Sequence, residues 1–372
     1  FSGVATAIGA SATDILQGGG GADTFTVEVG NVDLNGQDFQ GMDALEGLGD
    51  DDIFDINANF AGTIDGGEGS DNFVIADGVA LTFAGTALDG GVDADGDDTD
   101  TLDISEDVDA QAVSLTGSTL NEGFAGTVAT VFTGVGGGFD GIDAVAGSGD
   151  ETLTGTAANP STWTQTSYSD GSETLTFSGV ATAIGASATD ILQGSNSTDP
   201  ADADVFTVNT DHVDLNGQVD FEGMDALEGL AGDDVFNIDN SFAGTVDGGA
   251  GSDELDVSAD AGALTVDLTT SVAGEGFTGT VATVTGGFTG IDAVAGSGDE
   301  TLTGTAANPS TWTQTSYSDG SETLTFSGVA TAIGASATDI LQGGGGADTF
   351  TVEVGNVDLN GQDFQGMDAL EG

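Results

Sequence analysis

Acidic side chains recur at one fixed place in a glycine-rich motif. In the segments GGGGADTF, GGEGSDNF and GGAGSDEL, an Asp stands two residues before an apolar residue, at Asp23, Asp71 and Asp253. Such a corner offers one carboxylate and several backbone carbonyl oxygens at fixed spacing, and Ca²⁺ prefers about six to eight oxygen ligands. Stacked Asp side chains would also repel one another unless a cation lay between them. The motif therefore predicts calcium sites, with solvent-exposed, turn-capping Asp residues as the alternative.

Looser copies of the motif extend this set. GLGDDDIF and GLAGDDVF end near Asp52 and Asp234, and two copies carry Asp-rich insertions before their Asp. The D-x-D-x-D run in the first insertion is similar to a helical calcium loop only superficially, so it is interpreted as an expanded corner. The expected metal ligands are Asp14, Asp23, Asp43, Asp52, Asp71, Asp93, Asp95, Asp97, Asp100, Asp190, Asp204, Asp225, Asp234, Asp253, Asp339 and Asp348.

Long exact repeats set the organisation of the chain. Residues 1–47 recur unchanged as residues 326–372, and residues 142–194 recur as residues 291–343. Repetition of this kind is typical of arrays in which each unit packs on the next, so the array is expected to be longer than this window.

A shared 18-letter segment marks the repeat boundaries. FSGVATAIGASATDILQG begins at Phe1, Phe177 and Phe326. It divides the chain into a solenoid repeat unit A at 1–176, a unit B at 177–325, and the start of the next unit A at 326–372.

The pattern of apolar residues predicts an all-β fold. Runs such as T-F-T-V, I-F-D-I and T-L-T-G alternate apolar and polar residues, as strands with one inward face do. All 20 Phe residues stand either two residues after a motif Asp or at the start of an F-x-G triplet. One repeated inward position explains both slots. We therefore expect a right-handed parallel β-solenoid, of the β-roll or β-helix type, with Gly- and Asp-rich corners and internal ladders of Phe and aliphatic residues.

The spacing of the corners predicts the length of a coil. Asp52 and Asp71 are 19 residues apart, as are Asp234 and Asp253, which indicates coils of about 19 residues made of two nonapeptide half-turns. At a strand spacing of about 4.8 Å, one period of 325 residues (326 − 1) would then advance by about 80 Å.

Turn signals of a second kind precede several F-x-G triplets. Asn35-Gly36 and Asn216-Gly217 are dipeptides that favour two-residue hairpins. The segment TWTQTSYSDGSETLTF, which contains Trp163 and recurs around Trp312, is interpreted either as a hairpin flap or as part of a regular coil.

Charge and composition exclude several classes of protein. The chain of 372 residues has 64 Asp and Glu, no Lys or Arg, and a formal charge of −64, which repels nucleic acid and anionic lipid. A hydrophobic content of 38% argues against disorder, and the absence of Cys excludes disulfides and thiolate metal sites. No apolar run is long enough for membrane insertion. A salt-adapted cytoplasmic protein is the alternative explanation of the acidity.

The segment LQGGGGADTFTV, together with FSGV followed by a glycine-rich motif, resembles the RTX-type calcium-binding nonapeptide repeats of giant secreted bacterial proteins of the β-strand-repeat, adhesin-like kind. The resemblance implies a parallel β-roll, Ca²⁺ held between stacked Asp corners, and an extracellular or cell-surface location. Perfect motifs are few, so the calcium sites are expected to be sparse.

The sequence favours a structural function. Exact repeats with a uniform acidic exterior build length without marking a unique site, so we expect a calcium-stabilised fibre, sheath or matrix filament that self-associates head to tail and laterally through calcium. A stalk or spacer of a large secreted adhesin is the alternative. No enzyme is expected, because His212 is the one His and no Lys or Arg is present. Thr-rich runs also allow an ice-binding surface, although strand propensity explains them more simply.

Overall fold

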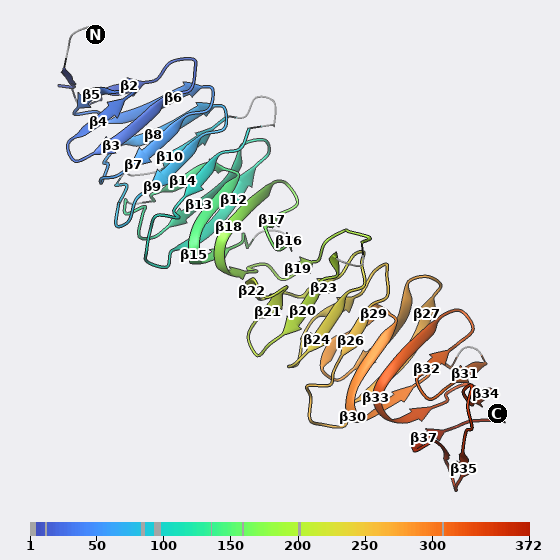
Figure 1. Cartoon of the computed structure of the whole chain (residues 1–372). Coiled ribbons are helices and arrows are strands. Elements are labelled where there is room, and N and C mark those ends of the chain that lie inside the picture. The colour runs from blue at the N-terminus through green and yellow to red at the C-terminus, as the bar shows by residue number, and fades with distance from the viewer. Residues whose placement is uncertain are drawn as a thin grey trace. The chain divides into compact units, whose positions relative to one another are not determined.

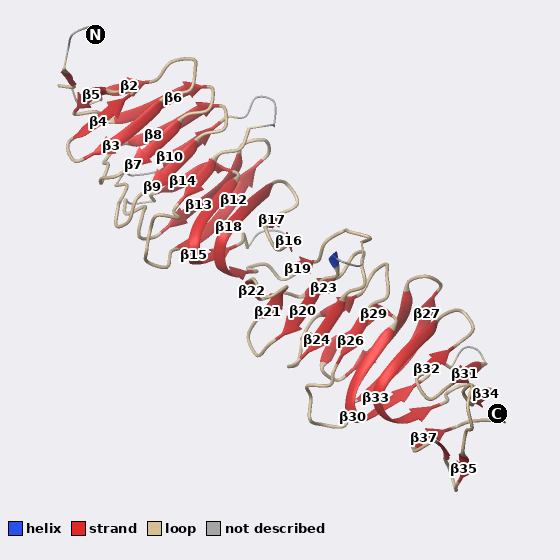
Figure 2. Ribbon diagram, in the orientation of Figure 1, coloured by secondary structure: helices blue, strands red, loops and turns tan. Residues whose placement is uncertain are grey.

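The computed structural model describes residues 5–11, 13–82, 86–92, 98–134, 136–157, 160–199, 202–306 and 309–372. Over these residues the protein is all-β, with 38 strands, no α-helix and a short 3₁₀ turn at Asp202 (Figure 2). No helix able to cross a membrane occurs in these described ranges. The chain divides into two compact units, residues 1–190 (unit 1) and 191–372 (unit 2).

Most strands are short, because glycine- and Asp-rich turns interrupt the apolar alternation every few residues. The strands that begin in unit 1 are β1 (Thr6–Ile8), β2 (Ile15–Gln17), β3 (Thr24–Glu28), β4 (Asn31–Leu34), β5 (Gln37–Gln40), β6 (Ala44–Gly49), β7 (Ile53–Ile56), β8 (Thr63–Glu68), β9 (Asn72–Ile75), β10 (Thr86–Gly91), β11 (Thr101–Asp103), β12 (Ala112–Thr119), β13 (Gly123–Val128), β14 (Gly138–Ile142), β15 (Ala144–Thr154), β16 (Ser161–Trp163), β17 (Ser167–Ser169), β18 (Thr174–Ile184) and β19 (Asp190–Gln193).

The strands of unit 2 follow a similar order. They are β20 (Val205–Val208), β21 (Val213–Leu215), β22 (Val219–Glu222), β23 (Ala226–Glu228), β24 (Val235–Ile238), β25 (Thr245–Asp247), β26 (Glu254–Asp256), β27 (Thr265–Val272), β28 (Gly276–Val281), β29 (Val284–Ile291), β30 (Ala293–Thr303), β31 (Ser310–Trp312), β32 (Ser316–Ser318), β33 (Thr323–Ile333), β34 (Asp339–Gln342), β35 (Phe350–Val352), β36 (Val357–Leu359), β37 (Gln362–Gln365) and β38 (Ala369–Glu371).

Each unit contains two columns of parallel strands in register. In unit 1 one column runs through β2, β6, β8, β10 and β14. The other runs through β3, β7, β9, β11, β15 and β18, and Figure 1 shows β3, β7 and β9 side by side. Unit 2 has the corresponding columns β23, β25 and β29, and β20, β24, β26, β30 and β33. Parallel pairing places equivalent side chains one strand spacing apart.

The core consists of the ladders that this register creates. Phe25 stacks on Phe54 with ring centroids 4.7 Å apart, and Phe54 stacks on Phe73 at 5.1 Å. In unit 2, Phe206 stacks on Phe236 at 4.8 Å. Centroid distances of this size equal the strand spacing, so the sheet register sets the stacking.

The inward position of Phe, predicted from its two sequence slots, is confirmed. All the described F-x-G phenylalanines are buried except Phe39, which is half-buried, and Phe350 is the one half-buried member of the other slot. Phe1 and Phe83 lie outside the described residues. The ladder is therefore one repeated packing position.

The prediction of uniform coils of about 19 residues is wrong. A separation of 19 occurs once in each unit, from Asp52 to Asp71 and from Asp234 to Asp253. Other steps between corner Asp residues take 29 residues (Asp23 to Asp52) or more, up to 43 residues at Asp100. In the other column, β8 to β10 takes 24 residues (88 − 64) and β10 to β14 takes 51 (139 − 88). The extra residues form antiparallel hairpins between the parallel columns, such as β3–β4–β5 and β12–β13–β14.

The predicted two-residue turns make these hairpins. Asn35 and Gly36 have φ values of 52° and 85° between β4 and β5, and positive φ at both central residues is typical of a type I′ turn. The Trp163 segment, left open by the sequence, is an antiparallel meander of β16, β17 and β18. Trp163 and Tyr168 are fully buried in it with ring centroids 4.4 Å apart, so the segment is part of the core.

Candidate metal centre

The corner Asp residues form a hydrogen-bonded ladder along each unit. The backbone N–H of Asp52 donates to Oδ1 of Asp71 at 2.8 Å, and that of Asp71 donates to Oδ1 of Asp100 at 2.8 Å. In unit 2, Asp204 donates to Asp234 at 2.7 Å and Asp234 donates to Asp253 at 2.8 Å. Since every step is parallel and in register, each corner carboxylate lies next to the corresponding corner of the following step.

Within the described part of the chain, four corners keep a buried carboxylate oxygen that has no hydrogen-bond partner. These oxygens are Oδ2 of Asp52, Asp71, Asp234 and Asp253, and the four residues are at most 1% exposed. A buried carboxylate oxygen without a partner carries a desolvation cost, unless a proton or a cation occupies the place beside it.

Glycine makes room for these oxygens. A Cβ atom at Gly66 would overlap Oδ2 of Asp71 and the carbonyl oxygen of Gly90, and a Cβ atom at Gly248 would overlap the carbonyl oxygen of Gly290 and lie 2.7 Å from Oδ2 of Asp253. Each cradle therefore brings a carboxylate oxygen and a carbonyl oxygen of the next step to one place. Oxygen pairs of this kind suit a hard cation such as Ca²⁺.

Burial raises the pKa of all four carboxyls, and neighbouring carboxylates add to the shift. The pKa of Asp71 rises to about 8, through burial first and then through the charges of Asp100 and Asp52. The pKa of Asp253 rises to about 7, and those of Asp52 and Asp234 rise to about 6, again mainly through burial. A negative charge at these corners is therefore costly without a neighbouring cation.

Five other predicted ligands have Oδ2 already occupied by a backbone N–H. The acceptors are Asp14, Asp23, Asp190, Asp204 and Asp339, and their donors are Ser11, Gly19, Ser187, Ser195 and Ser336. In these corners the carboxylate caps its own turn, although the close glycine approach persists: a Cβ atom at Gly18 would lie 2.5 Å from Oδ2 of Asp23 and 2.8 Å from the carbonyl oxygen of Gly47.

The remaining predicted ligands lie in different settings. Asp43 and Asp225 are exposed, and Asp43 accepts the N–H of Asp14. Asp100 is buried beside Gly90 and accepts the N–H of Asp71. Oδ1 of Asp348 accepts the side-chain amide of Asn360 at 3.1 Å. The run Asp93, Asp95 and Asp97 lies outside the described residues.

Glu151 and Glu300 are not among the predicted ligands, because their motif, GSGDETL, is shortened and has Glu at the Asp position, but both occupy full corner positions. Each is fully buried, and Oε2 of Glu151 accepts the N–H groups of Gly149 and Asp150 at 2.9 and 3.2 Å. Their loops are one residue shorter than the Asp loops, and the additional methylene group of Glu makes up the difference. A shortened loop followed by Glu was the signal.

Two further acidic groups were missed. Asp77, Asp107 and Asp109 form the one group of three carboxylates within 4.8 Å of one another in the described part of the chain. None of these residues occupies the Asp position of a glycine motif, so the sequence contained no signal for them.

A row of carboxylates also crosses the outer face of unit 1. Glu46, Asp65, Asp89 and Asp140 occupy successive register positions. The pKa of Asp89 is raised to about 6. Burial is the largest cause, and the negative charges of Asp65 and Asp140 raise the pKa further. This row follows from the pairing register, which the sequence alone did not provide.

Comparison with known proteins gives no family. Neither a protein-family model nor a curated protein matches this chain.

Proposed function

We propose that this chain is an extracellular, calcium-stabilised structural repeat protein in which the parallel columns wind as a right-handed β-solenoid. The observation that carries the proposal is the set of four buried Oδ2 oxygens at Asp52, Asp71, Asp234 and Asp253. A right-handed path is the general preference of parallel β connections. The corners repeat along both units and do not form a single reactive centre. Such repetition suits an extended, stiff structural element.

Calcium fits these four corners by their donor chemistry. Oδ2 of Asp71 and the carbonyl oxygen of Gly90 border one cradle, and the corresponding atoms of Asp253 and Gly290 border another. Bound Ca²⁺ would supply positive charge to a chain that has a formal charge of −64 and no Lys or Arg. The corners whose Oδ2 accepts a backbone N–H are proposed as weaker sites or as plain turn caps.

The calcium proposal is tested by chelation. Circular dichroism and a melting temperature are recorded with EDTA at neutral pH, then after addition of Ca²⁺ and, as a control, of the same ionic strength of Na⁺. A loosened or unfolded chain that Ca²⁺ restores and Na⁺ does not is the expected result, because the ligands lose their shared cation. A β-spectrum and melting temperature that EDTA leaves unchanged would exclude the calcium role.

The proposed assembly is a filament, formed head to tail and bundled laterally through calcium. Five parallel pairings join Phe25 to Phe177 over 152 residues (177 − 25), so a step takes about 30 residues and about 4.8 Å. A 325-residue period (326 − 1) then advances by about 50 Å, which replaces the value of about 80 Å from 19-residue coils. Electron microscopy of filaments measures this repeat.

The second candidate is a spacer within a large secreted adhesin. The same ladders and corners would then hold a separate binding domain away from a cell surface. A full-length sequence with a distinct terminal binding domain favours the adhesin, whereas repeats that continue throughout favour the filament.

A further inference from the structure

His212, the one His of the chain, replaces an Asn of the other hairpin copies. In the first copy, Nδ2 of Asn31 donates to Oδ1 of Asp38 across the hairpin at 3.2 Å, and the third copy repeats this bond. In the second copy His212 takes the place of Asn31 and faces Asp220, which corresponds to Asp38. The substitution therefore exchanges an amide for an imidazole at a place that already has a carboxylate.

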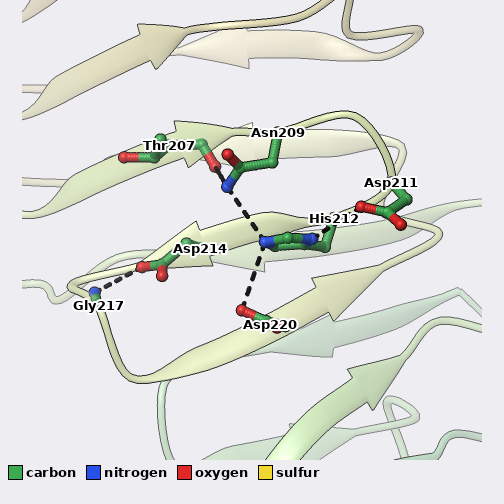
Figure 3. Close-up of polar contacts among 7 residues, drawn as sticks. All are labelled: Thr207, Asn209, Asp211, His212, Asp214, Gly217 and Asp220. Carbon is green, nitrogen blue, oxygen red and sulfur yellow. Dashed lines mark hydrogen bonds and ion pairs between the residues drawn. The ribbon is translucent and has the colours of Figure 1, made fainter.

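One carboxylate orients the imidazole ring. Nδ1 of His212 lies 3.0 Å from Oδ1 of Asp211 (Figure 3). An Nδ1–H that donates to a carboxylate fixes the tautomer of a neutral imidazole, and it leaves the lone pair on Nε2. The Asp211 contact is thus the kind of outer hydrogen bond that accompanies metal-binding histidines.

Two side chains converge on Nε2. Figure 3 shows Nδ2 of Asn209 on one side of it and Oδ1 of Asp220 on the other, at 3.1 and 3.5 Å. A half-turn of the Asn209 amide exchanges Nδ2 for the carbonyl oxygen, at the cost of the 3.4 Å hydrogen bond from Nδ2 to the backbone carbonyl of Thr207. Atoms bound to one metal at about 2.0–2.1 Å are about 3.0–3.4 Å apart, which these separations approach.

In this tautomer Nε2 can accept a hydrogen bond from Nδ2 of Asn209, and a cation between Nε2 and Asp220 would be stabilised in addition. The lone pair of Nε2 and the carboxylate oxygen are both acceptors, so they face each other unfavourably at 3.5 Å unless a proton or a metal lies between them. His212 is 25% exposed at its side chain. The side chain of Asp220 is 50% exposed, so water can reach the space beside it to complete a coordination shell.

The geometry points to a binding site for a first-row divalent transition metal, with His212 Nε2, Asp220 Oδ1 and the Asn209 amide oxygen as ligands. Imidazole nitrogen suits Zn²⁺, Ni²⁺ or Cu²⁺, whereas Ca²⁺ takes oxygen ligands. This site is independent of the corner Asp residues, and Asp211 acts as its positioning residue.

The test uses Zn²⁺ on the whole chain in a large excess of Ca²⁺, which saturates the other carboxylates. Isothermal titration gives the stoichiometry, and NMR of ¹³C-labelled His follows the single imidazole directly. One Zn²⁺ per chain is expected, with a shift of the His212 signals that saturates at the same concentration.

Three variants separate this site from general attraction to an acidic protein. His212→Asn, the residue of the other copies, leaves all carboxylates in place and abolishes the calcium-resistant Zn²⁺ site. Asp220→Asn weakens binding by about 10-fold or more, and Asp211→Asn weakens it by about 10- to 100-fold without a change of stoichiometry. Circular dichroism confirms that each variant folds.

Two results would overturn the proposal. One is a His212→Asn protein that binds Zn²⁺ in excess Ca²⁺ as the unmodified chain does. The other is an imidazole spectrum that saturating Zn²⁺ leaves unchanged, in which case Asp220 pairs with a protonated ring.

Discussion

Units 1 and 2 share their corners but differ on their outer faces. Each has one 19-residue step with two buried, unpartnered Oδ2 oxygens. On the outer face of unit 1, Asp89 pairs in register with Asp140, whereas the corresponding partner of Asp247 in unit 2 is Thr289. The corner and the core ladder therefore tolerate little change, because packing fixes them, while the outward positions of the same strands vary freely.

The corner carboxyls of the two units share one electrostatic property. The pKa of Asp71 rises to about 8 and that of Asp253 to about 7, in both cases chiefly through burial. Each unit therefore contains a corner carboxyl that is costly to charge without a cation.

Calcium removal has the largest expected effect and tests whether the two units respond alike. At about pH 7, hydrogen exchange after EDTA treatment should increase around both Asp71 and Asp253, because each corner is costly to charge without a cation. Mass spectrometry of peptides measures this. Equal exchange before and after chelation in both units contradicts the prediction.

Truncation of the Phe ladder should be costly in either unit. Phe54→Ala and Phe236→Ala each remove a fully buried ring, so each should lower the free energy of unfolding by about 3–5 kcal/mol. Chemical denaturation gives this value. Val29→Ala, at a side chain that is 92% exposed, is the control and should change stability by less than about 0.5 kcal/mol. A loss below 1 kcal/mol at both Phe positions would argue against a shared ladder.

Filling the glycine cradles should cost less than opening the core. Gly66→Ala and Gly248→Ala force a Cβ atom against a carbonyl oxygen of the next step, with an expected loss of about 1–3 kcal/mol and weaker Ca²⁺ binding. Gly20→Ala, whose Cβ meets no atom within 4 Å, is the matched control. If the cradle variants bind Ca²⁺ as well as the control does, the cradles do not hold the ion.

Calcium-free protein should lose stability as the pH rises. The folded-state pKa values of Asp71 and Asp253 lie above the ordinary value of 3.8, so the folded state holds protons that the unfolded chain has released. The contribution of these two carboxyls to the free energy of unfolding is then fully present below about pH 4, and it is lost as the pH rises through about 7 to 8. Melting temperatures across this range, with and without Ca²⁺, test the sign. Stability that increases with pH in EDTA would contradict it.

The smallest expected effect is on the outer row. Asp140→Thr gives unit 1 the residue type of unit 2 and removes one of the charges that raise the pKa of Asp89. The pKa of Asp89 should move down toward its ordinary value, with little change in stability, and NMR titration of the Asp89 carboxyl measures it. An unchanged titration curve would mean that burial alone sets the shift.

Local signals in the sequence determined the strands, the inward Phe positions and the Asn-Gly turns. Alternation, a fixed slot beside the motif Asp, and positive φ at Asn35 and Gly36 each depend on neighbouring residues, so one sequence is sufficient to recognise them. The corner Asp positions were also visible, because Gly and Asp recur at a fixed spacing.

Only the tertiary structure decided which corner faces which, and what each carboxylate meets there. Hairpins of different length separate successive corners, so a step takes 19 residues at Asp52 and 43 at Asp100. The unpartnered Oδ2 of Asp71, the full corner role of Glu151 and the group around Asp107 all depend on residues brought together from distant positions. The number of residues between two corners does not reveal such contacts. The entropic cost of closing a loop grows only slowly with its length, so corners separated by short and by long hairpins can pair equally well.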